Sequence, residues 1–173
     1  MKKLATYFAL CCFAAIPALA QSFTGFIGAG PSVPLNPLAG HTTNPGWNLS
    51  AGAGVTTNHV GMMLDFLYTD MTSNPTNSNA HTWGFTLDPV VHLTQEGPVD
   101  LYFTGGGGIY HSSLSIIDPP SSGAYKGGLD GGLGFSVRLG PTHLKAFAEA
   151  RYHYIFTSPV ATTVIPVTVG LRW

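Results

Sequence analysis

The end of the chain carries the pattern that most restricts its fold. Every second position from residue 167 onward is apolar, namely Val167, Val169, Leu171 and Trp173. The positions between them are small or polar: Thr168, Gly170 and Arg172. This period of two predicts a β-strand with one apolar and one polar face. The pattern reaches Trp173, whereas the terminus of a soluble domain is more often a frayed polar tail.

Composition extends this interpretation from one strand to the whole chain. Charged residues make up 9% of the 173 residues, against about 25% in ordinary globular domains. Beyond the N-terminal region the chain has no run of about 18 apolar residues, the length that a membrane-spanning helix requires. Low charge without such a run indicates that apolar residues are distributed over alternating strands, as a membrane β-barrel requires.

Residues 1–20 have the features of a secretory signal peptide, which leaves 21–173 as a single domain. A basic start and an apolar run over residues 4–16 precede a small-x-small cleavage site, Ala18-Leu19-Ala20. Both cysteines lie inside this leader, and a lipoprotein signal is disfavoured because Leu10 precedes Cys11 where a small residue is required. Loss of the two leader lysines changes the net charge from −1 to −3, which argues against nucleic-acid binding.

Strand-like segments recur along the rest of the chain. Eight of them can be placed, at residues 23–30, 47–56, 60–69, 82–93, 99–110, 125–138, 143–155 and 163–173, the fifth interrupted by Gly105 to Gly108. Long connections rich in Pro, Asn, Ser, Thr and Gly alternate with tight ones. The long ones are 31–46, 70–81, 112–124 and 156–162, and the tight ones are 57–59, 94–98 and 139–142. We therefore predict an all-β, eight-stranded antiparallel up-and-down transmembrane barrel, with both termini at the short-turn end.

The alternation also predicts which side chains face lipid. If Leu171 and Trp173 point outward, no outward strand position carries a charge. The charges of the strands share the inward phase: Asp65, Asp88, Asp100, Lys126, Asp130, Arg138, Lys145, Glu149, Arg151 and Arg172. A basic residue facing lipid near the midplane costs about 2–4 kcal/mol, which explains the segregation. Aromatic side chains at strand ends are predicted to form two interfacial girdles: Tyr68, Trp83, Tyr152 and Tyr154 at the outer end and Trp173 at the inner end.

The C-terminal strand resembles that of bacterial outer-membrane barrels, and residues 149–154 resemble the penultimate strand of the OmpA/OmpX-like family. The resemblance implies an outer-membrane location with periplasmic termini and extracellular long loops, and contact with lipid and lipopolysaccharide. It also implies recognition of Val169, Leu171 and Trp173 by the barrel-assembly machinery. We expect a monomer without a cofactor, with a structural or surface-interaction role, and an unidentified ligand for the outer loops.

The inward charges are predicted to form two levels. The lower level holds Asp100, Arg138, Lys145 and Arg172, and the middle level holds Asp65, Asp88, Asp130, Glu149 and Arg151. One interpretation is a plug of salt bridges, and the alternative is a narrow channel. The plug is favoured because the interior of eight strands is just wide enough for side chains to fill it. OmpA-like barrels have a similar ionic cluster, and this resemblance also implies a plug of salt bridges.

Other candidate sites are weaker. Gly105 to Gly108 does not precede a helix pattern, so a phosphate-binding loop is disfavoured. The histidines show no metal-ligand spacing. His111 and Ser113 share a strand face, as in the His-x-Ser pair of outer-membrane lipid A deacylases. Here, however, no Glu follows between residues 115 and 138, so a hydrolase is a minor alternative and we expect no enzymatic activity.

Overall fold

The computed structural model describes residues 22–35, 42–74, 78–94, 97–115, 124–158 and 161–173. Eight long strands dominate it: β1 (Ser22–Pro34), β3 (Gly46–Thr56), β4 (Val60–Asn74), β5 (Ser78–His92), β6 (Val99–Ser115), β7 (Ala124–Arg138), β8 (Lys145–Ile155) and β9 (Thr162–Arg172). A two-residue strand, β2 (Thr42–Thr43), pairs with the end of β4. No helix in the described part of the chain is long and apolar enough to span a membrane.

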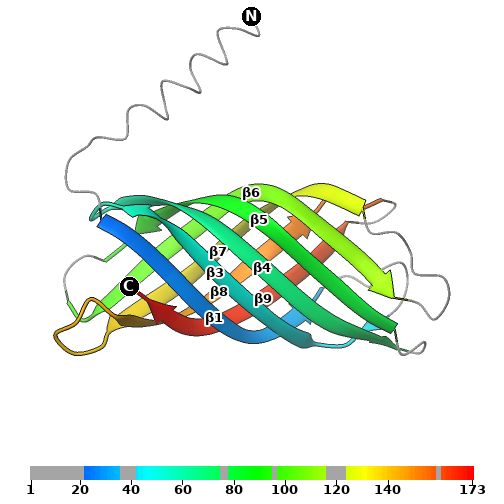
Figure 1. Ribbon diagram of the computed structural model, residues 1–173, viewed down its shortest axis with the longest axis horizontal. Coiled ribbons are helices and arrows are strands. Elements are labelled where there is room, and N and C mark those ends of the chain that lie inside the picture. The colour runs from blue at the N-terminus through cyan, green and yellow to red at the C-terminus, as the bar shows by residue number, and fades with distance from the viewer. Residues whose placement is uncertain (1–21, 36–41, 75–77, 95–96, 116–123, 159–160) are drawn as a thin grey trace, which may run out of the picture.

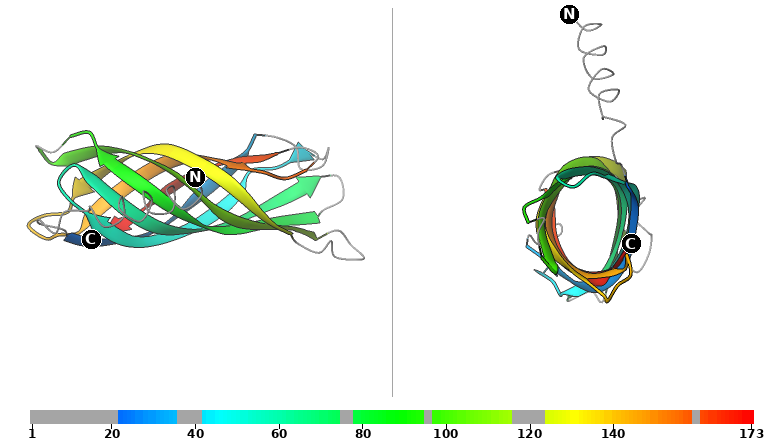
Figure 2. Two further views of the ribbon diagram at one scale, coloured as in Figure 1. Left: turned by 90° about the horizontal axis from the view of Figure 1, so that it is seen from above. Right: turned by 90° about the vertical axis from the view of Figure 1, so that its left-hand side faces the viewer.

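The eight long strands form a closed barrel. Each pairs antiparallel with the next along the chain, and β1 pairs with both β3 and β9, so the sheet returns to its first strand. The end-on view shows this closed ring (Figure 2). The predicted eight-stranded antiparallel barrel is therefore confirmed, and β2 is the one strand among the described residues that the sequence pattern missed.

Tight turns and both described chain ends lie at the same rim. Ser22 pairs with Thr56, next to the 57–59 turn, and Lys145, next to the 139–144 turn, pairs with Arg172. Figure 1 shows the start of β1 and the C-terminus at this end of the barrel, which we call the short-turn rim. The opposite end, where the longer connections lie, is called the long-loop end.

Two local predictions are wrong. Residues 70–81 were expected to form a long loop, but β4 and β5 stay paired as far as Ser73 and Ser78. Asp70 therefore lies on a strand, and on the outward phase, opposite His81. The expected interruption of the 99–110 strand is also absent, because β6 continues in one register through its four glycines. At Gly108 a side chain would collide with the carbonyl of Phe85, so glycine lets β5 and β6 approach there.

The side-chain phase follows the alternation along the strands. On β7, Leu133 is 61% exposed and Ser136 is 1% exposed. The other outward apolar residues of the central strands are likewise exposed, including Leu64, Phe85, Leu129 and Phe135. An apolar outer surface surrounds a lumen filled with buried polar, charged and aromatic side chains, as a barrel embedded in lipid requires.

Candidate functional site in the barrel lumen

Arg151 of β8 occupies the centre of the lumen and contacts four carboxylates. Its Nη1 donates to Asp65 (2.8 Å) and Asp88 (2.6 Å), and lies 3.7 Å from Asp130. Its Nη2 lies 2.7 Å from the Glu149 carboxylate, to which Nε also donates at 2.9 Å. These five residues are called the ionic cluster. It joins β4, β5, β7 and β8 across the barrel, and Arg151 is only 7% exposed.

An apolar layer lies directly below the ionic cluster, on the side of the short-turn rim. Met63, Val90 and Phe147 stand one inward position nearer that rim than Asp65, Asp88 and Glu149 respectively. They pack as one buried group with two aromatic residues, Phe26 and Tyr102. At the long-loop end a second buried group consists of Met71, Ala80 and Val164. The cluster is thus enclosed from both directions by packed side chains.

Little space remains around the cluster. A cavity of about 20 Å³ adjoins Asp65, Glu149 and Arg151, which is room for about one water molecule. On the long-loop side, Tyr110 hydrogen-bonds His153 (2.9 Å) and donates to Asp130 (3.4 Å). Packed side chains therefore fill most of the lumen at the level of the ionic cluster.

Arg172 starts at the level of Lys145 near the short-turn rim, and its side chain reaches toward the ionic cluster. Its guanidinium sits 4.3 Å from the centre of the Tyr102 ring and 5.3 Å from that of Phe147, and its Nη2 is 4.0 Å from Glu149. A long side chain that rises from the rim and stacks on aromatic faces gains cation–π stabilisation. Arg172 also lines the cavity at the short-turn rim together with Asp100, Arg138 and Lys145, so it connects the predicted lower level with the ionic cluster.

A second polar group lies near the short-turn rim. Asp100 accepts from Nδ1 of His92 (2.9 Å) and lies 3.6 Å from Nζ of Lys145, while Nε2 of His92 is hydrogen-bonded to Thr56 (3.2 Å). His92 was missed from the sequence because a single histidine carries no periodic signal. Its one clue was its inward phase opposite the start of the 99–110 strand. Arg138 is exposed at this rim, and no ion pair involves it among the described residues.

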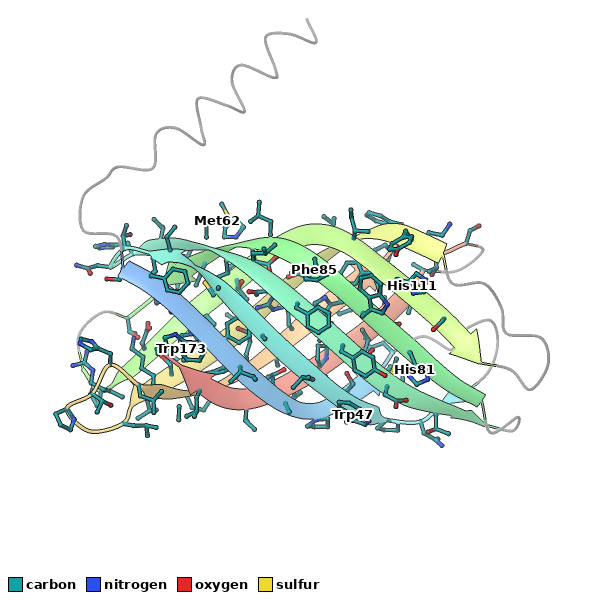
Figure 3. The ribbon with its side chains drawn as sticks, viewed as in Figure 1. Trp47, Met62, His81, Phe85, His111 and Trp173 are labelled. Atoms are coloured by element: carbon teal, nitrogen blue, oxygen red, sulfur yellow. The ribbon has the colours of Figure 1, made fainter. Side chains whose placement is uncertain are left out.

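Aromatic side chains encircle part of the outer surface toward the long-loop end. Trp47 packs on Tyr68, which hydrogen-bonds His81 (3.1 Å), and Nδ1 of His81 lies 3.5 Å from Asp70. Tyr152 and Tyr154 are exposed on the outward face of β8, and Trp173 is exposed at the opposite rim. Figure 3 shows Trp47, His81 and His111 on the outside of the barrel, toward the end opposite Trp173.

The side chain of His111 contacts aromatic rings. Its ring stacks on Trp83 (5.3 Å between centroids) and meets Tyr125 edge-on (5.0 Å). Ser113, the suggested nucleophile, lies two residues further along β6, and its cross-strand partner is His81. A base must be hydrogen-bonded to its nucleophile and oriented by a third group, and the contacts of His111 are instead aromatic. Among the described residues, no group of three His, Cys, Asp or Glu side chains is placed to bind a metal ion.

Comparison with known proteins identifies the family. Residues 6–172 match the outer membrane protein beta-barrel domain, and the chain belongs to this family. No curated protein sequence matches it. Family membership places the chain in the outer membrane, where such barrels contact lipid and lipopolysaccharide.

Solved structures show the same fold. The barrel is similar to Neisserial surface protein A, with 16% identity, 88% of this chain and 97% of that chain covered, and a TM-score of 0.69. It is also similar to a major outer membrane protein from Thermus thermophilus, with 13% identity, 89% of this chain and 98% of that chain covered, and a TM-score of 0.63. A third similar structure is the N-terminal barrel domain of Pseudomonas aeruginosa OprF, with 13% identity, 87% of this chain and 97% of that chain covered, and a TM-score of 0.56. At these identities the likeness concerns the fold alone.

Proposed function

We propose that this chain is a non-enzymatic, non-conducting barrel that stabilises the bacterial envelope or presents its long-loop end to partners at the cell surface. The observation that carries the proposal is the filled lumen, in which the ionic cluster lies between two apolar layers. A barrel without an aqueous path can act through its outer surface and its loops, whereas a pore cannot have a lumen packed in this way.

Conductance recording tests this function against the narrow-pore alternative. Refolded protein would be inserted into planar bilayers, with insertion verified by the heat-dependent gel shift of closed barrels. We expect no current steps above those of the lipid alone. Regular steps from the wild-type protein would overturn the proposal.

The same preparation, incubated with lipid A and analysed by mass spectrometry, tests the hydrolase alternative, and release of an acyl chain would show that the protein is an enzyme.

The proposed orientation has periplasmic termini and extracellular long loops. It is supported by the gathering of tight turns and both described chain ends at one rim. Both cysteines lie at positions 11 and 12, inside the predicted leader, so a single introduced cysteine reports its own location. Ser158→Cys, at the long-loop end, should react with an impermeant maleimide on intact cells. Asn58→Cys, in a tight turn, should react only after the outer membrane is permeabilised, and the opposite result would reverse the orientation.

Assembly and oligomeric state complete the proposal. Val169, Leu171 and Trp173 occupy the outward phase at the end of β9 and are proposed to be read by the barrel-assembly machinery. Trp173→Ala should reduce the amount of barrel assembled in cells while leaving refolding in vitro intact. Equal losses in both settings would indicate a purely structural role. We also propose a monomer, which mass measurement in detergent can test.

A further inference from the structure

The barrel contains an open cavity beneath its plug. It occupies about 590 Å³ at the short-turn rim and is lined by residues of most of the strands. The apolar layer closes the inner end of the cavity, since Met63 and Val90 belong both to the cavity lining and to that layer. We call this cavity the vestibule. It is large enough to hold a small organic molecule, in contrast to the single-water space beside Arg151.

Three basic residues stand in direct register in the vestibule wall. Lys145 of β8 is the cross-strand partner of Arg138 on β7 and also of Arg172 on β9, and all three line the cavity. Like charges directly opposite each other on neighbouring strands are destabilising. The chain has seven basic residues, two of them in the leader, so this one row holds three of the remaining five. A stability argument alone does not account for this concentration of positive charge.

Acidic groups offset this row only in part. Asp100 is the one Asp or Glu among the residues that line the vestibule, and it is engaged by both His92 and Lys145. Glu149 reaches Arg172 only at 4.0 Å, from the far side of the apolar layer. The main-chain oxygen of Trp173, at the rim, already accepts from the amide of Gly25 and the hydroxyl of Thr24. Positive charge therefore remains available to a ligand.

Buried donors without partners provide an independent indication of a ligand. The Ser136 side chain is 1% exposed, lines the vestibule, and its hydroxyl makes no hydrogen bond among the described residues. Nε of Arg172, which is 8% exposed, is likewise unpaired within the described chain. A buried polar group left unsatisfied costs about 1–3 kcal/mol. Such donors beside a row of cations can donate hydrogen bonds to the oxygens of an anion.

We propose that the vestibule binds the phosphate group of a small phosphate monoester. Arg138, Lys145 and Arg172 would surround the phosphate from three adjacent strands, with Ser136 donating from the side of the apolar layer. A tetrahedral oxyanion accepts hydrogen bonds from several directions, and guanidinium groups match its geometry. The remaining volume, walled partly by Met63 and Val90, accommodates the organic part of the ligand. This site is independent of whether the barrel conducts.

Calorimetric titration of the refolded barrel in detergent at low salt tests the proposal. The probes are glycerol 3-phosphate, inorganic phosphate and, as a neutral control, glycerol. We expect saturable binding of both phosphates and none of glycerol, with tighter binding of the monoester if the organic part is recognised. Equal affinities would assign the site to free phosphate. No saturable binding of either phosphate would overturn the proposal.

Variants separate this site from general charge attraction. Arg138→Gln should weaken glycerol 3-phosphate binding at least tenfold, since a hydrogen bond to a charged group is worth about 1.5–3 kcal/mol. Lys126→Gln is the matched control, because it removes the same charge from the same strand at a residue outside the vestibule. Ser136→Ala should weaken binding by about threefold or more without lowering stability, because its hydroxyl has no partner to lose. Equal effects of Arg138→Gln and Lys126→Gln would refute the site.

Discussion

Replacement of Arg151 by methionine removes the cation from the ionic cluster while keeping much of the side-chain volume. Asp65 and Asp88 would each lose a charged hydrogen bond of 2.8 Å or shorter, and Glu149 would lose contacts from both Nε and Nη2. Breaking a buried ion pair from one side typically costs about 3–5 kcal/mol, because the other charge remains buried without compensation. We expect a loss of stability in this range for Arg151→Met.

Urea unfolding of the refolded barrel in lipid vesicles measures this loss. The urea concentration at the midpoint of unfolding should fall. The slope of the unfolding free energy against urea concentration should stay the same, as expected for a change in stability alone. Arg151→Lys should give an intermediate loss, because one ammonium group cannot reproduce the divergent contacts of a guanidinium. Arg138→Met is the control. It should leave stability unchanged or slightly raised, since it relieves a like-charged neighbour at the exposed rim.

The reasoning would be refuted if Arg151→Met unfolded at the same urea concentration as the wild-type barrel. Such a result would mean that water, rather than Arg151, compensates the four carboxylates. The lumen would then be hydrated, and the narrow-pore alternative would become the better account of the protein. A loss shared equally by Arg138→Met would instead show that any reduction of interior charge impairs refolding, and the assay would say nothing specific about the cluster.

Three further predictions concern the membrane face and processing. Leu133→Arg, on the lipid face, should cost about 2–4 kcal/mol, whereas Ser136→Arg can extend into the vestibule and should cost less; the reverse order in urea unfolding would contradict the face assignment. The closed barrel should fractionate with outer membranes and migrate differently in gels before and after boiling. Soluble recovery from the periplasm without a gel shift would contradict this. The mature protein should begin at Gln21, and N-terminal sequencing that finds residues 1–20 retained would exclude the predicted cleavage.

The strand faces were predictable because they depend on a strictly local rule. Successive side chains of a strand alternate between two environments, and a charge in lipid is costly, so the two phases can be told apart by their charges. The phase that placed Leu133 outward and Ser136 inward follows directly from this rule. Where the residues at a strand end are polar on both faces, the rule cannot distinguish the inward face from the outward face, or a strand from a loop. The β4–β5 hairpin shows this, since Ser, Thr and Asn around residue 75 read as a loop although the strands remain paired to Ser73 and Ser78.

The arrangement inside the lumen was predictable only in part. Counting residues from the rim brings Arg151 near Asp65, Asp88 and Glu149, which it contacts. The same counting places Arg172 beside Lys145, but it does not reveal that the long side chain reaches the Tyr102 ring and approaches Glu149. Strand tilt adds a second source of error, since equal counts on neighbouring strands of a barrel do not give equal heights. Ring contacts and side-chain reach are tertiary properties that periodicity does not encode.

The plug and the vestibule place opposite charges in adjacent layers of one lumen. Four carboxylates around Arg151 lie above the apolar layer, and the row of three cations lies below it, with Arg172 contacting both sides. An anion that entered from the short-turn rim would be attracted as far as this row. Beyond it the anion would meet packed aromatic side chains and then excess negative charge in a medium of low dielectric. The same ionic cluster that closes the barrel would therefore stop a bound phosphate from passing further along the lumen, so binding at this rim and the absence of conduction are physically compatible.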